Sequence, residues 1–380
     1  MITRSLFYDD PLAREFSVQV VSCTQREKLW AVTLADTLFY PEGGGQAGDT
    51  GALGAVRVLD TREEDGCVVH LCDGPLPVGD VVTGAIDFAQ RLDRMQQHSG
   101  EHILSGLIFR KFGYHNVGFH LGEETTEMDF DGIIPQEALP ELERLANEAV
   151  MADLPIRSFI PAPQELAGLE YRTKKALPWP VRIVEIPGYD SCACCGVHVP
   201  TTGRIGLIKI LSCVKFHSGV RLELVCGYRA IAYMARVWEE SRQAGRLLSA
   251  PVTEVAQAAQ RLQQQLTQEK YRASNLEKQL FAAIAHRFAG KGDSLCVYED
   301  LDAAQTRLLA DAITQICGGC GCVLSGKNIC LLGAQERVNA LANRLRALGI
   351  RGGGKPGSFQ GVWETEPTKL LLEEGFCQVS

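Results

Sequence analysis

Short stretches of apolar or alternating residues dominate the first 90 positions of the chain. Residues 16–21 and 29–34 have the length and the alternation that are typical of strands. Further strands are expected at residues 55–59 and 67–71, and the turn signal Asp73-Gly74-Pro75 follows the last of them. Short strands separated by regular turns predict a small β-barrel over residues 1–90.

The apolar pattern changes to a helical period after residue 90. Ile103, Leu104, Leu107 and Ile108 fall on one side of a helix predicted for residues 91–112. Pro140 opens a second predicted helix at residues 141–152, and strands are expected at 116–121, 126–130, 181–186 and 206–211. Helices mixed with antiparallel strands predict an α+β domain over residues 91–234.

Residues 235–288 are rich in Gln, Ala, Glu and Leu, and their apolar positions recur at alternating spacings of three and four. This spacing predicts the seam of a coiled coil, formed by Val255, Ala259, Leu262, Leu266, Ala273, Leu276 and Leu280. The seam is interrupted at Glu269, so we expect a short helical arm or a hairpin. Because a seam is stable only when it is buried against another helix, we expect a homodimer through the C-terminal region. A helix packed on its own domain is the alternative.

Strand and helix patterns alternate in residues 289–380. Strands are expected at 295–298, 322–324 and 329–332, and helices at 303–316 and 334–347. This alternation predicts a small C-terminal α/β domain. The predicted fold class of the whole chain is α+β, with the barrel, the α+β domain, the helical arm and the α/β domain in that order.

The composition is that of a soluble globular protein. With 380 residues, 46% of them hydrophobic and 22% charged, the chain is long enough for two or three domains with real cores. It has neither a run of 18 apolar residues nor an apolar signal segment at the start, so we expect no membrane partner and a cytoplasmic location. The 14 cysteines then predict reduced thiols plus a metal site. Cys317, Cys320, Cys322 and Cys330 lie in an apolar, glycine-rich stretch and are expected as core residues, with a second metal site as the alternative.

The net charge of −8 argues against indiscriminate nucleic-acid binding, which depends on Lys and Arg neutralising phosphates. Basic residues nevertheless cluster between Arg204 and Arg246, and Arg221 is one of them. This local basic face predicts an anionic partner that is gripped in one place. A solvated face with scattered counter-ions is the alternative.

Two pairs of metal-binding residue types are each spaced by four positions. His98 and His102 would lie on one face of the predicted helix, with both imidazoles near one point. Cys194 and His198 repeat the spacing downstream, and a thiolate with imidazoles is the usual donor set for zinc. We therefore predict that these four residues bind Zn²⁺. The alternative is that the cysteines of this stretch fill core positions and His198 is a solvated loop residue.

Three motifs occur in a characteristic order: TLFYPEGGGQAGDTG, HSGEH and CCGVHVPTTGRIGLIKI. Together they resemble the editing domain of alanyl-tRNA synthetases and of the long-form, AlaX-type alanyl-tRNA editing proteins. Cys195 and Val197 depart from the Gly and Thr that are common in the synthetases, which affects details of the pocket but not the metal ligands. The matching positions are Thr37, Phe39, Tyr40, Gly44, Gly45, Gln46, Asp49, Gly51, His98, His102, Cys194, Gly196 and His198.

The resemblance implies a hydrolase that removes serine from mischarged tRNA(Ala), with glycine as a second candidate. It also implies that the glycine loop of a translation-factor-like barrel reaches the editing site. Within that site Thr37 would bond the serine hydroxyl, and Gln46 would orient water or ribose. Adenylation motifs would precede the barrel, which here begins at the N-terminus, so we expect the protein to act in trans.

The last domain resembles the DHH-associated domain of the same synthetases and long editing proteins. Backbone amides of a glycine loop can cradle phosphates, so Gly353, Gly354 and Lys355 are expected to contact tRNA. Arg221 is a further expected tRNA contact, on the basic face of the second domain.

Other classes of function remain open. Four protein ligands would leave no open position on a zinc ion, which is typical of a structural site; the chain would then be a non-catalytic tRNA-binding and dimerisation protein. The Gly-Gly-Gln triplet also occurs in peptide release factors, but here Phe39 and Tyr40 precede it, and it lacks a basic loop. A phosphoesterase is disfavoured because the first DHH catalytic motif is absent.

Overall fold

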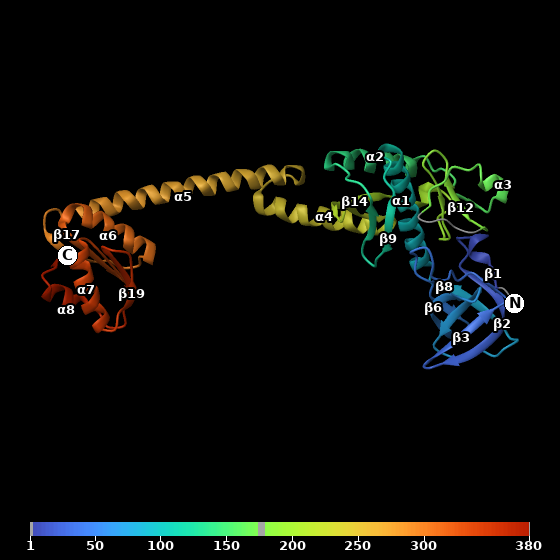
Figure 1. Ribbon diagram of the computed structural model, residues 1–380, viewed down its shortest axis with the longest axis horizontal. Helices are drawn as coiled ribbons and strands as arrows, with labels where there is room; N and C mark the ends of the chain where they lie inside the picture. Colours follow the sequence, from blue (N-terminus) through green and yellow to red (C-terminus); the bar gives the residue numbers. More distant parts are fainter. Residues whose placement is uncertain (1–2, 174–178, 380) are drawn as a thin grey trace. The chain divides into compact units, whose positions relative to one another are not determined.

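The computed structural model describes residues 3–173 and 179–379, which belong to two compact units, Met1–Arg242 and Gln243–Ser380 (Figure 1). The mixed α and β class predicted from the sequence is confirmed. The units divide within helix α4, Gly227–Leu248, which runs across the boundary predicted at residue 234. The helix continues through that position because no proline lies between Gly227 and Pro251.

Six strands of the first unit close into a barrel in the order β2-β3-β7-β6-β5-β8. Side chains alternate along a strand, and Val18, Val20, Val32 and Leu34 accordingly point into the barrel core. Two short strands, β1 (Arg4–Ser5) and β4 (Asp36–Thr37), pair in parallel outside the closed order. The barrel strands are Glu15–Arg26 (β2), Leu29–Leu34 (β3), Gly51–Leu53 (β5), Val56–Glu64 (β6), Cys67–Cys72 (β7) and Val81–Ile86 (β8).

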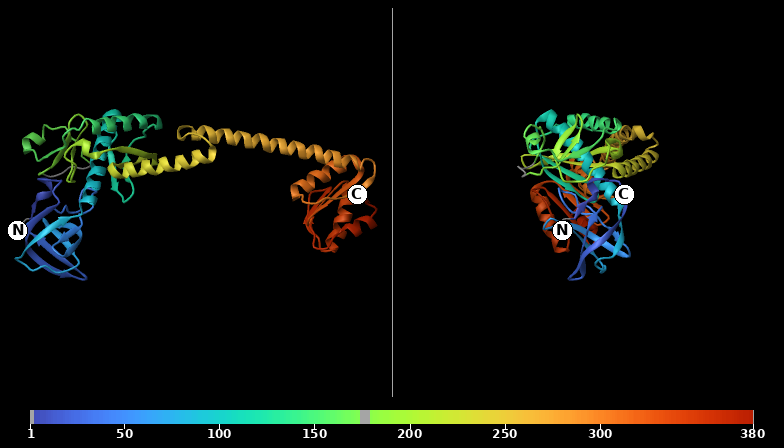
Figure 2. Two further views of the ribbon diagram at one scale, coloured as in Figure 1. Left: turned by 180° about the vertical axis from the view of Figure 1, so that it is seen from behind. Right: turned by 90° about the vertical axis from the view of Figure 1, so that its right-hand side faces the viewer.

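Helix α1, Phe88–Phe112, leads out of the barrel into the rest of the first unit (Figure 2). It begins after Asp87, whose Oδ1 accepts a hydrogen bond from the backbone N–H of Gln90 (3.2 Å), and it ends at Gly113, where φ is 74°. Every residue from Met95 to Ile108 is buried. The helix is therefore a core element with polar residues inside it, whereas the sequence pattern predicted a single apolar stripe.

Two sheets and helix α2 (Leu139–Met151) pack around α1. The buried apolar side chains of α1, α2 and the four-stranded sheet, among them Leu104, Leu142 and Leu222, form one core. The four-stranded sheet has the order β14-β15-β10-β9, and the three-stranded sheet has the order β11-β12-β13. The remaining elements are β9 (Asn116–Leu121), β10 (Thr126–Phe130), β11 (Arg157–Phe159), α3 (Pro163–Leu166), β12 (Ile183–Ile186), β13 (Asp190–Ala193), β14 (Ile208–Phe216) and β15 (Gly219–Cys226), with 3-10 turns η1 (Leu6–Tyr8), η2 (Gln136–Ala138) and η3 (Thr202–Ile205).

The second unit contains helix α5, Val255–His286, and an α/β domain. The sheet of this domain has the order β19-β20-β18-β17-β16-β21. Asp302 caps helix α6 by accepting a hydrogen bond from the backbone N–H of Gln305 (2.9 Å). The elements are η4 (Val252–Glu254), β16 (Gly292–Val297), α6 (Ala303–Cys317), β17 (Gly318–Ser325), β18 (Asn328–Leu332), α7 (Gln335–Ala347), β19 (Arg351–Gly353), β20 (Ser358–Val362), α8 (Thr368–Glu373) and β21 (Cys377–Gln378).

Helix α5 runs unbroken through Glu269, so the interrupted seam lies on one long helix and does not form a hairpin. Its side chains Leu262, Leu266, Leu276 and Leu280 are between 49% and 56% exposed. The homodimer expected from this seam stays a prediction. In the described part of the chain, no helix combines the length and the apolar character needed to cross a membrane.

Cys317, Cys320, Cys322 and Cys330 are buried in the apolar cores of the α/β domain. Burial raises the pKa of Cys320 and of Cys330 to about 11, which keeps both thiols protonated near neutral pH. Metal ligation requires thiolates. The burial of these cysteines in the apolar cores agrees with their expected role as core residues.

A buried ion pair joins the barrel to α1. Arg91, which is fully buried on α1, contacts Asp49 of the glycine loop through Nε at 2.9 Å and also through Nη2. The same guanidinium donates to the carbonyl of Leu38 (2.6 Å), and Asp49 accepts from the backbone N–H of Tyr40 (2.7 Å). The pair therefore holds both ends of the loop that contains the Gly-Gly-Gln triplet.

We expect Asp49→Asn to lower the free energy of unfolding by roughly 3–5 kcal/mol, because it leaves the buried Arg91 charge uncompensated. Urea unfolding followed by circular dichroism measures this change. The control is Glu64→Gln, which removes the exposed Arg26–Glu64 pair (2.7 Å) of the same barrel and should cost less than about 1 kcal/mol. Equal effects of the two substitutions would contradict the importance of the buried pair.

Candidate metal centre

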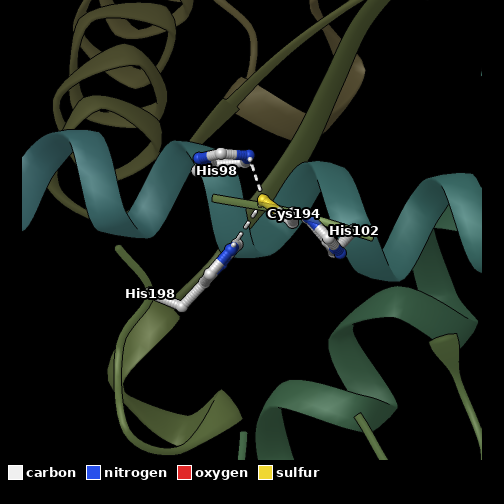
Figure 3. A group of neighbouring side chains, drawn as sticks. All are labelled: His98, His102, Cys194 and His198. Carbon is white, nitrogen blue, oxygen red and sulfur yellow. Dashed lines mark hydrogen bonds between the residues drawn. The ribbon is translucent and has the colours of Figure 1, made fainter. Parts of the chain in front are cut away.

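His98 and His102 lie one turn apart on α1, and both side chains are only 2% exposed (Figure 3). Their ring centroids are 5.3 Å apart. The predicted helix and its four-residue spacing thus bring the two imidazoles together inside the core. Two imidazoles that are buried away from water need polar partners within the protein.

Cys194 and His198 come from the loop that follows β13. Gly196 between them lies against His98, since a Cβ atom at this position would be 2.2 Å from Cε1 of that ring. The backbone N–H of Gly196 also donates to the Cys194 sulfur (3.3 Å). The C-x-G-x-H spacing therefore has a physical reason: only glycine lets the loop approach the histidine helix closely enough.

The four side chains converge on one point (Figure 3). Cys194 Sγ lies 3.5 Å from His98 Nε2 and 3.4 Å from His198 Nε2, and the ligand atoms of all four residues are within 4.8 Å of one another. Tetrahedral zinc with bonds of about 2.0–2.3 Å requires ligand atoms about 3.3–3.8 Å apart. The donor set and the two separations measured from Cys194 fit a zinc ion.

Each histidine is oriented by a hydrogen bond at its Nδ1 atom. His98 Nδ1 lies 3.0 Å from Gln46 Oε1, His102 Nδ1 lies 2.8 Å from Asp190 Oδ2, and His198 Nδ1 lies 3.1 Å from Ser99 Oγ. An imidazole that donates through Nδ1 presents the lone pair of Nε2. Such partners are the usual support of metal-binding histidines, and here they come from the barrel loop, from β13 and from α1.

The electrostatics of the cluster favour the ligand forms of Cys194 and His198. Burial raises the pKa of Cys194, but the nearby His98 and His102 outweigh it and hold that pKa well below its usual range. Burial, together with the neighbouring His98, lowers the pKa of His198 to about 3. A thiolate and a neutral imidazole are the states that bind metal.

The cluster forms part of the wall of a cavity of about 720 Å³. His98, His102 and Cys194 line this cavity, whereas His198 lines a smaller one. Phe119 stacks on His98 with ring centroids 5.0 Å apart. A metal held by the four residues would therefore be accessible from the larger cavity.

The barrel contributes its glycine loop to the same cavity. Gly44 and Gly45 line it with positive φ values of 60° and 84°, and a Cβ at Gly45 would lie 2.6 Å from the Phe119 ring. Both positions thus require glycine. Gln46, at the end of the triplet, is fully buried and reaches His98. The predicted contact between barrel and site is present, with Gln46 in contact with a ligand histidine.

Thr37 and Arg221 lie elsewhere in the first unit. Thr37 is fully buried in the barrel, where its Oγ1 is 2.8 Å from His70 Nε2 and accepts from the backbone N–H of Phe39 (3.0 Å). The structure therefore does not bring Thr37 into the described lining of the cavity. Arg221 lies on β15, pairs with Asp129 at 2.7 and 2.9 Å, and stacks over Phe216.

Gly353, Gly354 and Lys355 belong to the second unit. Gly353 ends β19, and Gly354 and Lys355 follow it in the loop before β20. All three are exposed. Whether they contact tRNA stays a prediction.

Several residues of the site have no obvious motif in the sequence. Asp190 reaches His102 because β13 pairs with β12, and Asn116 enters the cavity wall because β9 begins beside α1. Neither contact has a recognisable spacing along the chain. Glu101 is different, since it lies three residues after His98 and hence on the same face of a helix, a signal that was available.

Comparisons with known proteins agree with this arrangement. Residues 181–222, which contain Cys194 and His198, match the family described as threonyl and alanyl tRNA synthetase second additional domain. Residues 12–90 match class II (A) tRNA synthetases. Both matched segments thus contribute to the site, one through the glycine loop and one through the cysteine motif.

Relatives match nearly the whole chain. The alanine–tRNA ligase of Ignicoccus hospitalis is 30% identical over 387 positions, which cover 97% of this chain and 42% of the ligase. The alanine–tRNA ligase of Pyrococcus abyssi is 31% identical over 78% of the chain and 34% of the ligase. The chain thus spans less than half the length of these ligases. Alanyl-tRNA editing protein Aarsd1 of Danio rerio is 29% identical over 97% of each protein.

We expect the purified protein to hold about one zinc ion per chain, as measured by atomic absorption. Cys194→Ser should lose this zinc, because hydroxyl oxygen is a poor substitute for thiolate. The matched control is Cys195→Ser, which changes the neighbouring thiol outside the four-residue cluster and should keep the metal. Full zinc content in Cys194→Ser would remove Cys194 from the ligand set.

Proposed function

The chain is a homologue of the alanyl-tRNA editing proteins and of alanine–tRNA ligases, and on that premise we propose that it is a deacylase acting on mischarged tRNA(Ala). The proposed substrate is Ser-tRNA(Ala), with Gly-tRNA(Ala) as a second candidate. The observation that carries the proposal is the location of the cluster, because three of its four proposed ligands face a cavity. A purely structural metal site has no need of such a cavity.

The proposed metal is zinc, held by His98, His102, Cys194 and His198. When bound, and with one of the four ligands displaced or a fifth position open towards the cavity, it would supply a Lewis acid for the ester carbonyl or for water. The protein's own part is to keep the imidazoles fixed, through Gln46 at His98 and Asp190 at His102. Gln46 is thus proposed as a positioning residue. Thr37 has a similar, more distant role, since its bonds to His70 and Phe39 N hold the start of the glycine loop.

The dimensions and charge of the cavity support this substrate class. About 720 Å³ is within the range of sites for small ligands and accommodates an aminoacyl group with its terminal nucleoside. Arg182 lines the wall and donates to the carbonyls of Cys194 and Gly196, both at 2.9 Å. Because both partners are neutral carbonyls, they do not neutralise the guanidinium. Its positive charge at the wall would attract the phosphates of a tRNA end.

Zinc-loaded protein should release serine from tRNA(Ala) that has been charged separately with labelled serine. His102→Ala should lower kcat/KM by at least about 100-fold, since even the outer partners of metal ligands commonly contribute 10–100-fold. The control is His120→Ala, an exposed histidine of β9. Tight binding of Ser-tRNA(Ala) without release of serine would support the alternative of a non-catalytic tRNA-binding protein.

The proposed partners beyond the site are the body of tRNA and a second copy of the chain. Gly353, Gly354 and Lys355 offer backbone amides and a charge to phosphates. The half-exposed leucines of α5 support the proposal of a homodimer formed by the C-terminal region. Arg221 would contribute less, because its charge is already opposed by Asp129 and Glu127.

Lys355→Glu should raise KM for Ser-tRNA(Ala) by about tenfold, equivalent to ~1.4 kcal/mol, while kcat stays unchanged. The effect should shrink as salt is added, because it is electrostatic. Lys369→Glu, at an exposed position of α8 in the same unit, makes the same charge change away from the loop. An equal rise of KM in both variants would indicate a general charge effect and no specific contact.

A further inference from the structure

Glu101 is a buried carboxylate in the wall of the cavity. It is 6% exposed, and its Oε1 accepts hydrogen bonds from Ser105 Oγ and Asn116 Nδ2, both at 2.6 Å. In residues 3–173 and 179–379 it forms no ion pair with a lysine or an arginine. Burying a carboxylate whose hydrogen-bond donors are both neutral is costly, so a positive charge beside its second oxygen would stabilise it.

The second oxygen of Glu101 is turned towards the metal cluster. Its Oε2 lies 3.8 Å from His102 Nε2, the ring atom that faces Cys194 and His198. Among the cavity residues that the structure describes, Glu101 is the one acidic side chain. A cationic ligand group in this cavity would therefore lie beside Glu101 and next to the proposed metal.

Asn116 provides a second acceptor at the same place. Its Nδ2 donates to Glu101 Oε1 (2.6 Å) and to Ser105 Oγ (3.1 Å), which fixes the orientation of the amide. Its Oδ1 is buried and has no hydrogen-bond partner among the described residues. A buried acceptor without a partner costs about 1–3 kcal/mol, and a ligand that donates to it would offset this cost.

We propose that Glu101 and Asn116 form a binding site for the free α-ammonium group of the aminoacyl ester. A primary ammonium has three N–H donors and one positive charge, which match a carboxylate oxygen and an amide oxygen that lie together. This inference rests on the proposed function and adds a requirement to it. The substrate must carry an unmodified amino group, so an ester whose amino group is acylated, as in a peptidyl-tRNA, is excluded.

Binding of non-hydrolysable analogues tests the proposal without relying on catalysis. The probes are three amides of 3′-amino-3′-deoxyadenosine: the seryl amide, its N-acetyl derivative, and the analogue with hydroxyl in place of the amino group. Zinc-loaded wild-type protein should bind the seryl amide at least about tenfold more tightly than the other two in calorimetry, as expected for a charge-assisted contact. Glu101→Gln should bind all three with similar affinity.

Two further variants make the test specific. Asn116→Ala removes the amide acceptor and should reduce the preference for the free amine even if Glu101→Gln does not fold. Glu127→Gln neutralises a carboxylate of β10 that pairs with Arg221 and lies outside the described cavity lining, so it should leave the preference intact. Zinc content is measured for every variant.

Three results would overturn the proposal: wild-type protein that binds the three probes equally, a Glu101→Gln variant that keeps the preference, and loss of zinc from that variant, which would make Glu101 a metal ligand. Failure of the proposed function is a separate result. It would appear as no release of serine from Ser-tRNA(Ala) by wild-type protein, whatever the binding preference.

Discussion

The ion pair between Arg91 and Asp49 links the two halves of the site. Arg91 lies seven residues before His98 on the same helix, and Asp49 lies three residues after Gln46 on the glycine loop. A fully buried pair survives only when both partners are present and well bonded. Its geometry therefore fixes the position of the barrel loop relative to α1. The contacts of Gln46 with His98, and of Gly45 with Phe119, depend on this position.

The geometry of the metal cluster depends on several further elements of the first unit. Its residues come from α1 and from the loop after β13, and their hydrogen-bond partners come from the barrel, β13 and α1. Asp190 also accepts two hydrogen bonds from Arg172, at 2.7 and 2.8 Å. Its carboxylate is thus held from two sides, and His102 has little freedom to rotate. A bound metal would in turn join elements that are distant in sequence, so metal affinity and folding stability should be coupled.

The sequence predicted those parts of the site whose geometry is set by residues close together in the chain. Local spacings predicted the His98–His102 helix and the Cys194–His198 loop, because four residues determine their geometry. The partner Asp190 and the acceptor Asn116 depend on strand pairing and packing, which have no short-range pattern. Thr37 matches the family motif, yet its hydroxyl is turned to His70 in the barrel. The boundary predicted at residue 234 falls inside α4, because no local breaker ends that helix before Leu248.

The charges on the cavity wall would orient the proposed substrate. Arg182 provides positive charge at one part of the wall, which suits phosphates, and Glu101 provides negative charge next to His102, which suits an ammonium. An aminoacyl-tRNA end carries both charges, on opposite sides of its ester bond. With the amino group beside Glu101 and the nucleotide towards Arg182, the ester of the proposed substrate would face the part of the cavity lined by His98 and Cys194. Binding of both ends would orient the bond to be cleaved, and such positioning lowers the barrier of a reaction before any chemical group acts.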